Sequence, residues 1–131
     1  MTGRQLISSG GPWEDIIGYS RAVKVGDSIW VSGCTGTLAD GTVAEGIVAQ
    51  ARRALDVAGG ALAQGGARLQ DAVMLHIYLA DFAEFESIYP VLQEHFGKTK
   101  PAMTAVQVAA LISPQHRIEI EVQAVAGSAL D

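Results

Sequence analysis

The stretch from His116 to Ala126, HRIEIEVQAVA, constrains the fold of this chain more than any other segment. From Arg117 to Ala124 it alternates without a break between polar and apolar side chains. Because successive side chains of a β-strand point to opposite faces, this period of two predicts a strand with one core face and one polar face. The chain must therefore contain a sheet whose polar side carries at least two carboxylates, Glu119 and Glu121.

The other segments give the element order ββ(β)αβαββ. A Gly26-Asp27 turn predicts a hairpin, a second turn lies at Asp40-Gly41, and Pro90 fits only the first turn of a helix. The expected segments are strands near 21–25 and 28–32, an optional strand within 36–43, a helix over 45–64, a strand over 71–81, a short turn over 82–88, a helix over about 90–96, a strand over 102–109 and the strand described above.

This order predicts an α+β fold in which two helices cover only one face of the sheet. The uncovered face carries polar and aromatic side chains: Glu119, Glu121, Gln123, His76 and Tyr78. We therefore expect a partner subunit to cover it. Gly59-Gly60 lies inside the long helix, where each glycine costs about 0.5–1 kcal/mol relative to alanine. Close packing of that helix against the sheet is the expected compensation.

Composition excludes several classes of protein. With 131 residues, the chain fits a single domain, 1–131. Its net charge of −5 leaves no basic stripe for a nucleic-acid backbone, so that partner is not expected. No segment has the length of a signal peptide core or a membrane span, and Cys34 is the only cysteine. These features predict a cytoplasmic protein without a membrane partner.

Three segments in order resemble the RidA/YjgF family, also known as L-PSP endoribonucleases: GYSRAVKVGDSIWVSG, FGKTKPAMTAVQVAAL and RIEIEVQAVA. The resemblance spans about residues 15–126. It implies a chorismate-mutase-like fold of the bacillus type, with a mixed six-stranded sheet and two helices on one face. It also implies a homotrimeric barrel that binds a small-molecule ligand in each intersubunit cleft, without a cofactor.

The resemblance also implies an activity, the hydrolysis of reactive imines or enamines to keto acids and ammonia. In active relatives the motif Pro-Ala-Arg-Ser/Thr supplies an arginine that clamps the substrate carboxylate, and here Met103 takes its place before Thr104. The family match assigns a catalytic, water-positioning role to Glu119. It assigns substrate-binding positions to Tyr19, Ser32, Gly33, Cys34, Tyr89, Met103 and Thr104. Cys34 and Tyr89 also depart from the family pattern, where glutamine and asparagine are usual.

Replacing arginine by methionine removes a planar fork of donors and leaves an apolar side chain. The loss of one such charge-assisted contact costs about 1.5–3 kcal/mol, or about tenfold to a hundredfold in binding. Lys100 or Arg117 is a candidate substitute if its side chain reaches the pocket. The motif thus predicts a pocket for a ligand less acidic than an imino acid.

Each site residue also has a structural interpretation. Glu119 is either a pocket carboxylate or an interface carboxylate, and Tyr19 either lines the pocket or places a structural hydroxyl. Cys34 reads as a buried, inert thiol rather than a nucleophile, and Met103 as a pocket wall or packing residue. Trp13 and Trp30 are packing or pocket-rim residues. The three histidines have no metal-ligand spacing, so no metal site is expected.

Three functions remain open. The first is a RidA-like trimer that binds, and hydrolyses, a small imine, enamine or related metabolite. The second is a non-catalytic module that binds a metabolite or partners an enzyme. The third is an endoribonuclease, which the acidic balance of the chain disfavours because phosphate binding needs positive charge.

Overall fold

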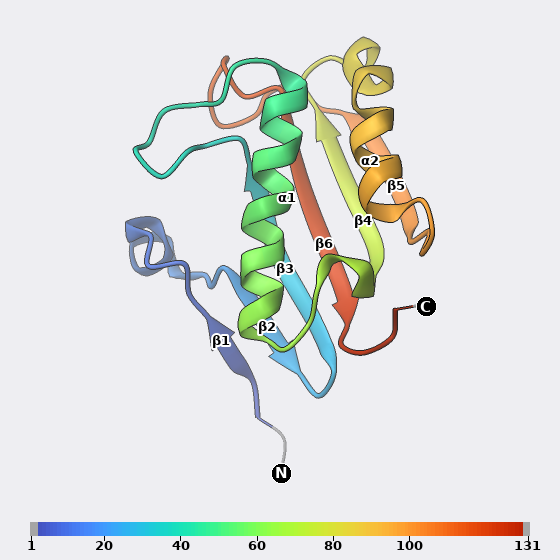
Figure 1. Cartoon of the computed structure of the whole chain (residues 1–131). Coiled ribbons are helices and arrows are strands. Elements are labelled where there is room, and N and C mark those ends of the chain that lie inside the picture. The colour runs from blue at the N-terminus through green and yellow to red at the C-terminus, as the bar shows by residue number, and fades with distance from the viewer. Residues whose placement is uncertain (1–2, 130–131) are drawn as a thin grey trace.

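A computed structural model describes residues 3–129, which form a six-stranded sheet packed against two α-helices (Figure 1). In chain order the elements are β1 (Gln5–Ile7), η1 (Glu14–Gly18), β2 (Ala22–Val25), β3 (Ser28–Thr35), α1 (Ile47–Gln64), η2 (Leu69–Asp71), β4 (Ala72–Leu79), η3 (Phe82–Ile88), α2 (Tyr89–Phe96), β5 (Ala102–Gln107) and β6 (Ile118–Val125). The strand order is β1-β2-β3-β6-β4-β5, with β4 and β5 parallel and all other neighbours antiparallel. The sheet is therefore mixed, as the family resemblance implies.

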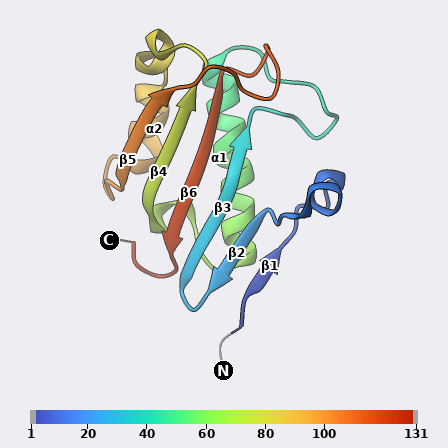
Figure 2. The ribbon, with the colours of Figure 1, turned by 180° about the vertical axis from the view of Figure 1, so that it is seen from behind.

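Both α-helices lie on the same face of the sheet (Figure 1), and the view from behind shows the opposite face without a helix (Figure 2). This confirms the predicted α+β layering. Among residues 3–129, no helix is both long enough and apolar enough to span a membrane.

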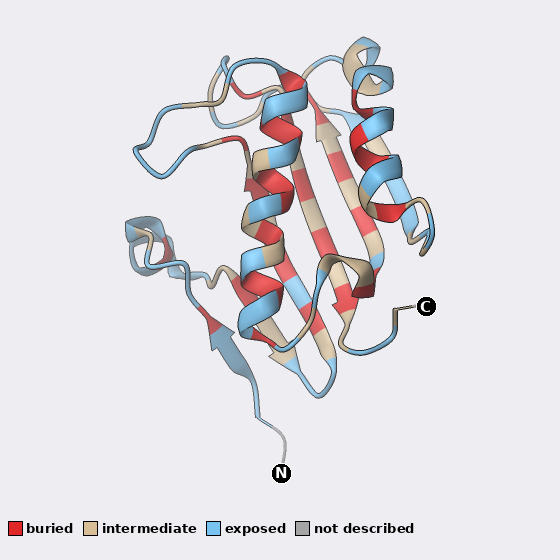
Figure 3. Cartoon of the chain, in the orientation of Figure 1, coloured by how far each residue is buried: buried red, intermediate tan, exposed pale blue. Residues whose placement is uncertain are grey.

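The alternation that predicts the last strand is realised along β6 and β4, whose residues switch between buried and half-buried (Figure 3). The apolar residues of β6 are completely or almost completely buried under α1: Ile118, Ile120, Val122 and Ala124. Glu119 and Glu121 point to the face of the sheet that no helix covers, called the bare face below, where they lie beside Tyr78 and His76 of β4. Val73 departs from the predicted pattern, since a register shift between Ala72 and Met74 places Ala72 in the core and leaves Val73 exposed.

The sixth strand is not where the sequence suggests it. Residues 36–43 make only one isolated bridge, Thr37 to Val43, because the Asp40 carboxylate accepts hydrogen bonds from the backbone N–H and hydroxyl of Thr42 and closes a local turn. The missing strand is β1, which pairs with β2 and buries a single side chain, Ile7. Three residues are too few to show a period of two.

The predicted close packing at Gly59-Gly60 is wrong. A Cβ on Gly60 would meet nothing within 4 Å, and one on Gly59 would meet only Leu69 at an ordinary 3.6 Å. The glycine that the fold does require is Gly36, where a Cβ would lie 2.7 Å from the Cα of Gln50. That close approach sets α1 against the end of β3.

Candidate functional site

Glu119 lies directly over Gly33, at an irregularity in the pairing of β3 with β6. The register of these strands shifts between Val31 and Cys34, so Ser32 and Gly33 form a bulge on the bare face of the sheet. A Cβ on Gly33 would overlap the carboxyl group of Glu119, with the Glu119 Cδ only 2.8 Å away. The absence of a side chain at this position therefore gives Glu119 its place against the backbone.

Three hydrogen bonds attach the chain before β2 to this bulge. The Ser32 N–H donates to the Arg21 carbonyl at 2.9 Å, and the Ser32 hydroxyl donates to the Ser20 carbonyl at 2.7 Å. The Arg21 Nη2 donates to the Gly33 carbonyl at 2.6 Å. Tyr19 precedes this attached segment and shares a surface hollow with Ser20 and Ser32. The structure thus brings Tyr19, Ser32, Gly33 and Glu119 to one region of one protomer.

The Glu119 carboxyl is electrostatically unusual. Partial burial raises its pKa above the ordinary value, the neighbouring charge of Glu121 raises it further, and the positive charge of Arg21 opposes both. A carboxylate with a raised pKa accepts a proton more readily, which suits a general base.

Beside Glu119, the bare face holds a second polar cluster. The Glu121 carboxylate accepts a hydrogen bond from the Tyr78 hydroxyl at 3.2 Å and lies 3.1 Å from His76 Nδ1. Glu121 therefore already has partners on β4, whereas Glu119 makes no side-chain hydrogen bond with any residue of the described chain.

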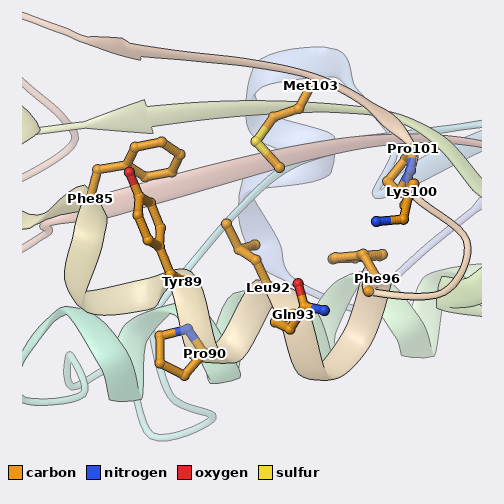
Figure 4. Close-up of a pocket in the computed structure, with 10 residues that line it drawn as sticks. Phe85, Tyr89, Pro90, Leu92, Gln93, Phe96, Lys100, Pro101 and Met103 are labelled. Atoms are coloured by element: carbon orange, nitrogen blue, oxygen red, sulfur yellow. The ribbon is translucent and has the colours of Figure 1, made fainter.

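The other predicted residues, Met103 and Tyr89, line a groove of about 590 Å³ between α2 and β5 (Figure 4). Lys100 lies at the end of the groove where β5 begins. The other walls are mostly apolar and aromatic and include Phe85, Tyr89, Leu92, Phe96, Pro101 and Met103. Phe85 and Tyr89 pack edge to face with ring centroids 5.3 Å apart. Two positions that depart from the family pattern, Met103 and Tyr89, thus lie in one groove.

The two groups of predicted residues do not meet within one chain. Met103 pairs with Leu75, a core residue under the helices, so its side chain lies on the helix-covered side of the sheet. Thr104 pairs with His76 and faces the bare side with Glu119. A single protomer therefore carries two half-sites, one at Glu119 and one at Met103.

Cys34 is not placed to line either half-site with its thiol. Its side chain is 1% exposed and belongs to the core between the sheet and α1, and burial raises the pKa of the thiol to about 11. The prediction of a buried thiol is confirmed, and the substrate-binding assignment of Cys34 stays a prediction that only its backbone could fulfil. The bulge at Ser32-Gly33 shifts the alternation of β3 and turns Cys34 inward.

The structure separates Arg117 and Lys100, the two residues considered above as substitutes for the arginine of the resembled motif. The Arg117 guanidinium donates two hydrogen bonds to the Glu84 carboxylate, one of them from Nε at 2.7 Å, so this arginine is already engaged. Lys100 lies at the Met103 groove, and its backbone has a φ of 50°, in the left-handed region that lysine rarely adopts.

Arg21 is the residue that the sequence reasoning missed. The sequence held one signal for it, its position next to Ala22 in the predicted strand 21–25. Ala22 is buried in the core, so the side chain of the preceding residue points to the opposite, bare face of the sheet.

Trp30 also lies on the bare face of β3, and Trp13 precedes η1; both are exposed, so neither packs in the core. Among residues 3–129, no three histidine, cysteine or acidic side chains gather to hold a metal ion.

A two-layer domain with this mixed six-stranded sheet and two helices on one face belongs to the chorismate-mutase-like α+β class. Within this class, the family model described as Endoribonuclease L-PSP matches residues 13–126. The chain belongs to that family, which is the RidA/YjgF family that its motifs resemble.

Relatives and solved structures support the assignment. A 2-iminobutanoate/2-iminopropanoate deaminase from Capra hircus is 35% identical over 126 residues, which cover 95% of this chain and 91% of the relative. A RutC family protein from Pyrococcus abyssi is 36% identical over 114 residues, 82% of this chain and 84% of the relative. A YjgF/YER057c/UK114 family member from Mycobacterium tuberculosis superposes with a TM-score of 0.87 at 39% identity, covering 95% of this chain and all of the other.

Proposed function

We propose that this protein hydrolyses the carbon–nitrogen double bond of a small imine, or of the enamine that tautomerises to it, with Glu119 as the proton-transferring carboxylate. The observation that carries the proposal is Glu119 itself. It is half-buried against Gly33, its pKa is raised, and no described side chain neutralises it through a hydrogen bond. Relatives that carry the name of an imine deaminase support this reaction class.

The chemistry needs one water molecule and no cofactor. Glu119 accepts a proton from water as the water oxygen bonds to the imine carbon, and the carbon–nitrogen π bond breaks toward nitrogen. Glu119 then returns this proton to nitrogen, which gives a carbinolamine. A second proton passes from the carbinolamine hydroxyl through Glu119 to the amine nitrogen, the carbonyl forms as the carbon–nitrogen single bond breaks, and ammonia leaves. A base whose pKa lies nearer to neutrality than that of a free carboxylate serves both transfers.

The groove at Met103 supports a ligand with an apolar body. Methionine and the aromatic rings of Phe85 and Tyr89 offer contact area but no fork of donors for a carboxylate. Lys100 supplies a single positive charge at one end. We therefore propose a substrate with a larger and less acidic body than 2-iminopropanoate.

We also propose that a second copy of the chain completes each site. The Glu119 half-site lies on the bare face of the sheet, and the Met103 half-site lies beside the edge strand β5. A head-to-tail contact that joins two different surfaces closes into a ring when each copy is rotated by a whole fraction of a turn, and a homotrimer needs a rotation of one third of a turn. A small-molecule enzyme with one free, buried cysteine is consistent with the cytoplasm as its compartment.

A non-catalytic binding module is the second candidate, and the missing arginine favours it. In that case the groove at Met103 binds a metabolite, and Glu119 contributes to binding without turnover. An endoribonuclease has less support, because the chain has a net charge of −5 and its bare face carries two carboxylates.

The two candidates separate in an assay of ammonia release from freshly generated imines, one with a carboxylate and one with an uncharged aromatic body. The wild-type protein should hydrolyse the aromatic imine faster than the uncatalysed reaction does, and Glu119→Gln should abolish this activity. Glu121→Gln is the matched control, since it removes the next carboxylate on the same face, one already bound by Tyr78. Wild-type protein without turnover would leave the binding module. A fully active Glu119→Gln variant would instead reject the role proposed for Glu119, because turnover would then not depend on this carboxylate.

A further inference from the structure

We propose that Arg21 is a positioning residue for Glu119: its guanidinium, anchored on the carbonyl of the glycine that the carboxylate covers, supplies the positive charge of this half-site without a direct ion pair. The inference rests on the proposed function, in which the Glu119 carboxylate transfers the proton. Arg21 and Glu119 converge on one residue, since the arginine binds the Gly33 carbonyl and the glutamate covers the Gly33 Cα.

The anchoring is built from both the backbone and the side chain of Arg21. Its carbonyl accepts the Ser32 N–H at 2.9 Å, and its Nη2 donates to the Gly33 carbonyl at 2.6 Å. These two contacts tie Arg21 to both residues of the bulge. A lysine keeps the backbone contact and the positive charge, but its ammonium is a point charge on a flexible stem and holds the Gly33 carbonyl less rigidly.

The Arg21 Nε is buried and has no hydrogen-bond partner in the described chain. An unpaired buried donor costs folding free energy, so a purely structural arginine would be expected to satisfy it. The positive charge of a guanidinium held in this way changes the pKa values of neighbouring groups through its electrostatic field. Burial raises the pKa values of Glu119 on β6 and Cys34 on β3, and the positive charge of Arg21 opposes the rise at both.

The other charged and titratable groups near Glu119 do not supply this positive field. Glu121 on the same strand is negative and raises the pKa of Glu119. Tyr78 on β4 is neutral at physiological pH, and its own pKa is raised by burial and by Glu121. The Cys34 thiol is also neutral, and His76 lies against Glu121 rather than Glu119. Arg21 is thus the cation that opposes burial at Glu119.

The test measures the pKa of Glu119 directly, by carboxyl-carbon NMR, in the wild-type protein and in Arg21→Met and Arg21→Lys. Removing the positive charge should raise the pKa of Glu119 in Arg21→Met, and Arg21→Lys should fall between the two. Arg53→Met is the matched control: Arg53 also donates to a backbone carbonyl, that of Thr37, but it does not contribute to the pKa of Glu119. In the activity assay, the acid limb of the pH–rate profile should move to higher pH in Arg21→Met.

An unchanged pKa of Glu119 in Arg21→Met, or an equal change in Arg53→Met, would overturn the proposal. If Arg21 acted only by binding a substrate carboxylate, Arg21→Met would raise KM for 2-iminopropanoate without a change in the pKa of Glu119, and that result would also overturn the proposal. Should Arg21→Met fail to fold, the wild-type protein decides. The chemical shift of the Arg21 Nε–H must change with pH at the pKa of Glu119. This change must disappear in Glu119→Gln. A fully active Glu119→Gln variant would reject the proposed function. If the Arg21 Nε–H shift still follows Glu119 in the wild type, the electrostatic coupling between Arg21 and Glu119 would hold without that function.

Discussion

At the scale of single residues, the account depends on the space that Gly33 leaves for Glu119. We predict that Gly33→Ala folds but loses ligand binding or turnover. The new Cβ would overlap the carboxyl group, and the long glutamate side chain can swing away at small cost to the fold. Activity should fall at least about tenfold, the effect of one lost charge-assisted contact. Thermal unfolding checks the fold, and an active variant with an unshifted Glu119 would contradict the prediction.

Met103 carries the second prediction at this scale. The wild-type protein should hydrolyse 2-iminopropanoate poorly, because its motif holds no donor for the carboxylate. Met103→Arg should raise kcat/KM for that substrate about tenfold or more, from one contact of about 1.5–3 kcal/mol. Met103→Leu is the control, since it keeps an apolar wall. A wild type as active as arginine-containing relatives would refute the idea that Met103 marks a changed substrate.

Sequence reasoning found most of the residues on the bare face, because alternation assigns each side chain of a strand to a face. The binding position of Cys34 came from the family motif, whereas its burial follows from a bulge that depends on the pairing of β3 with the distant β6. Sequence reasoning also left Lys100 and Arg117 as equal alternatives. Only the three-dimensional structure shows that Glu84, 33 residues before Arg117 in the chain, already engages that arginine.

At the scale of elements, segments with a clear period or with proline and glycine at their ends were predictable, and β1 was not. The predicted helix over 45–64 is α1, shorter by two residues at its start, and the turn over 82–88 is the 3-10 helix η3 with Asp81 as its cap. α2 begins one residue before Pro90 and ends before Gly97, as proline and glycine punctuation indicates. β1 escaped prediction because only its pairing with β2 defines it.

Helix α1 offers a stability prediction that follows from the open space at Gly60. Gly60→Ala should raise the free energy of unfolding by about 0.5–1 kcal/mol, because alanine has a lower entropic cost in a helix and its methyl group meets no neighbour. Gly36→Ala provides the contrast, since its Cβ would lie 2.7 Å from the Gln50 backbone and should destabilise the fold. Chemical denaturation of both variants measures the difference. A destabilised Gly60→Ala would mean that a neighbour covers α1 in the assembled protein.

At the scale of the whole molecule, the bare sheet face and the separated half-sites predict a trimer. Light scattering at micromolar concentration should give about three times the chain mass of 13.7 kDa. Glu119→Gln should leave that mass unchanged, since the carboxylate is assigned to the site and not to assembly. A stable monomer would remove both the oligomer and the shared site.

The most direct test of the account asks whether Glu119 of one copy faces Met103 of another. The variant Met103→Cys provides an accessible thiol to which a nitroxide label is attached. The label does not react with Cys34, because this residue is buried and the pKa of its thiol is about 11. Labelled copies are mixed with isotope-enriched wild-type copies, and paramagnetic broadening is recorded on the enriched copies alone. The account predicts broadening of the resonances of Tyr19, Ser32, Gly33 and Glu119. Mixed oligomers in which these four resonances stay sharp would contradict it.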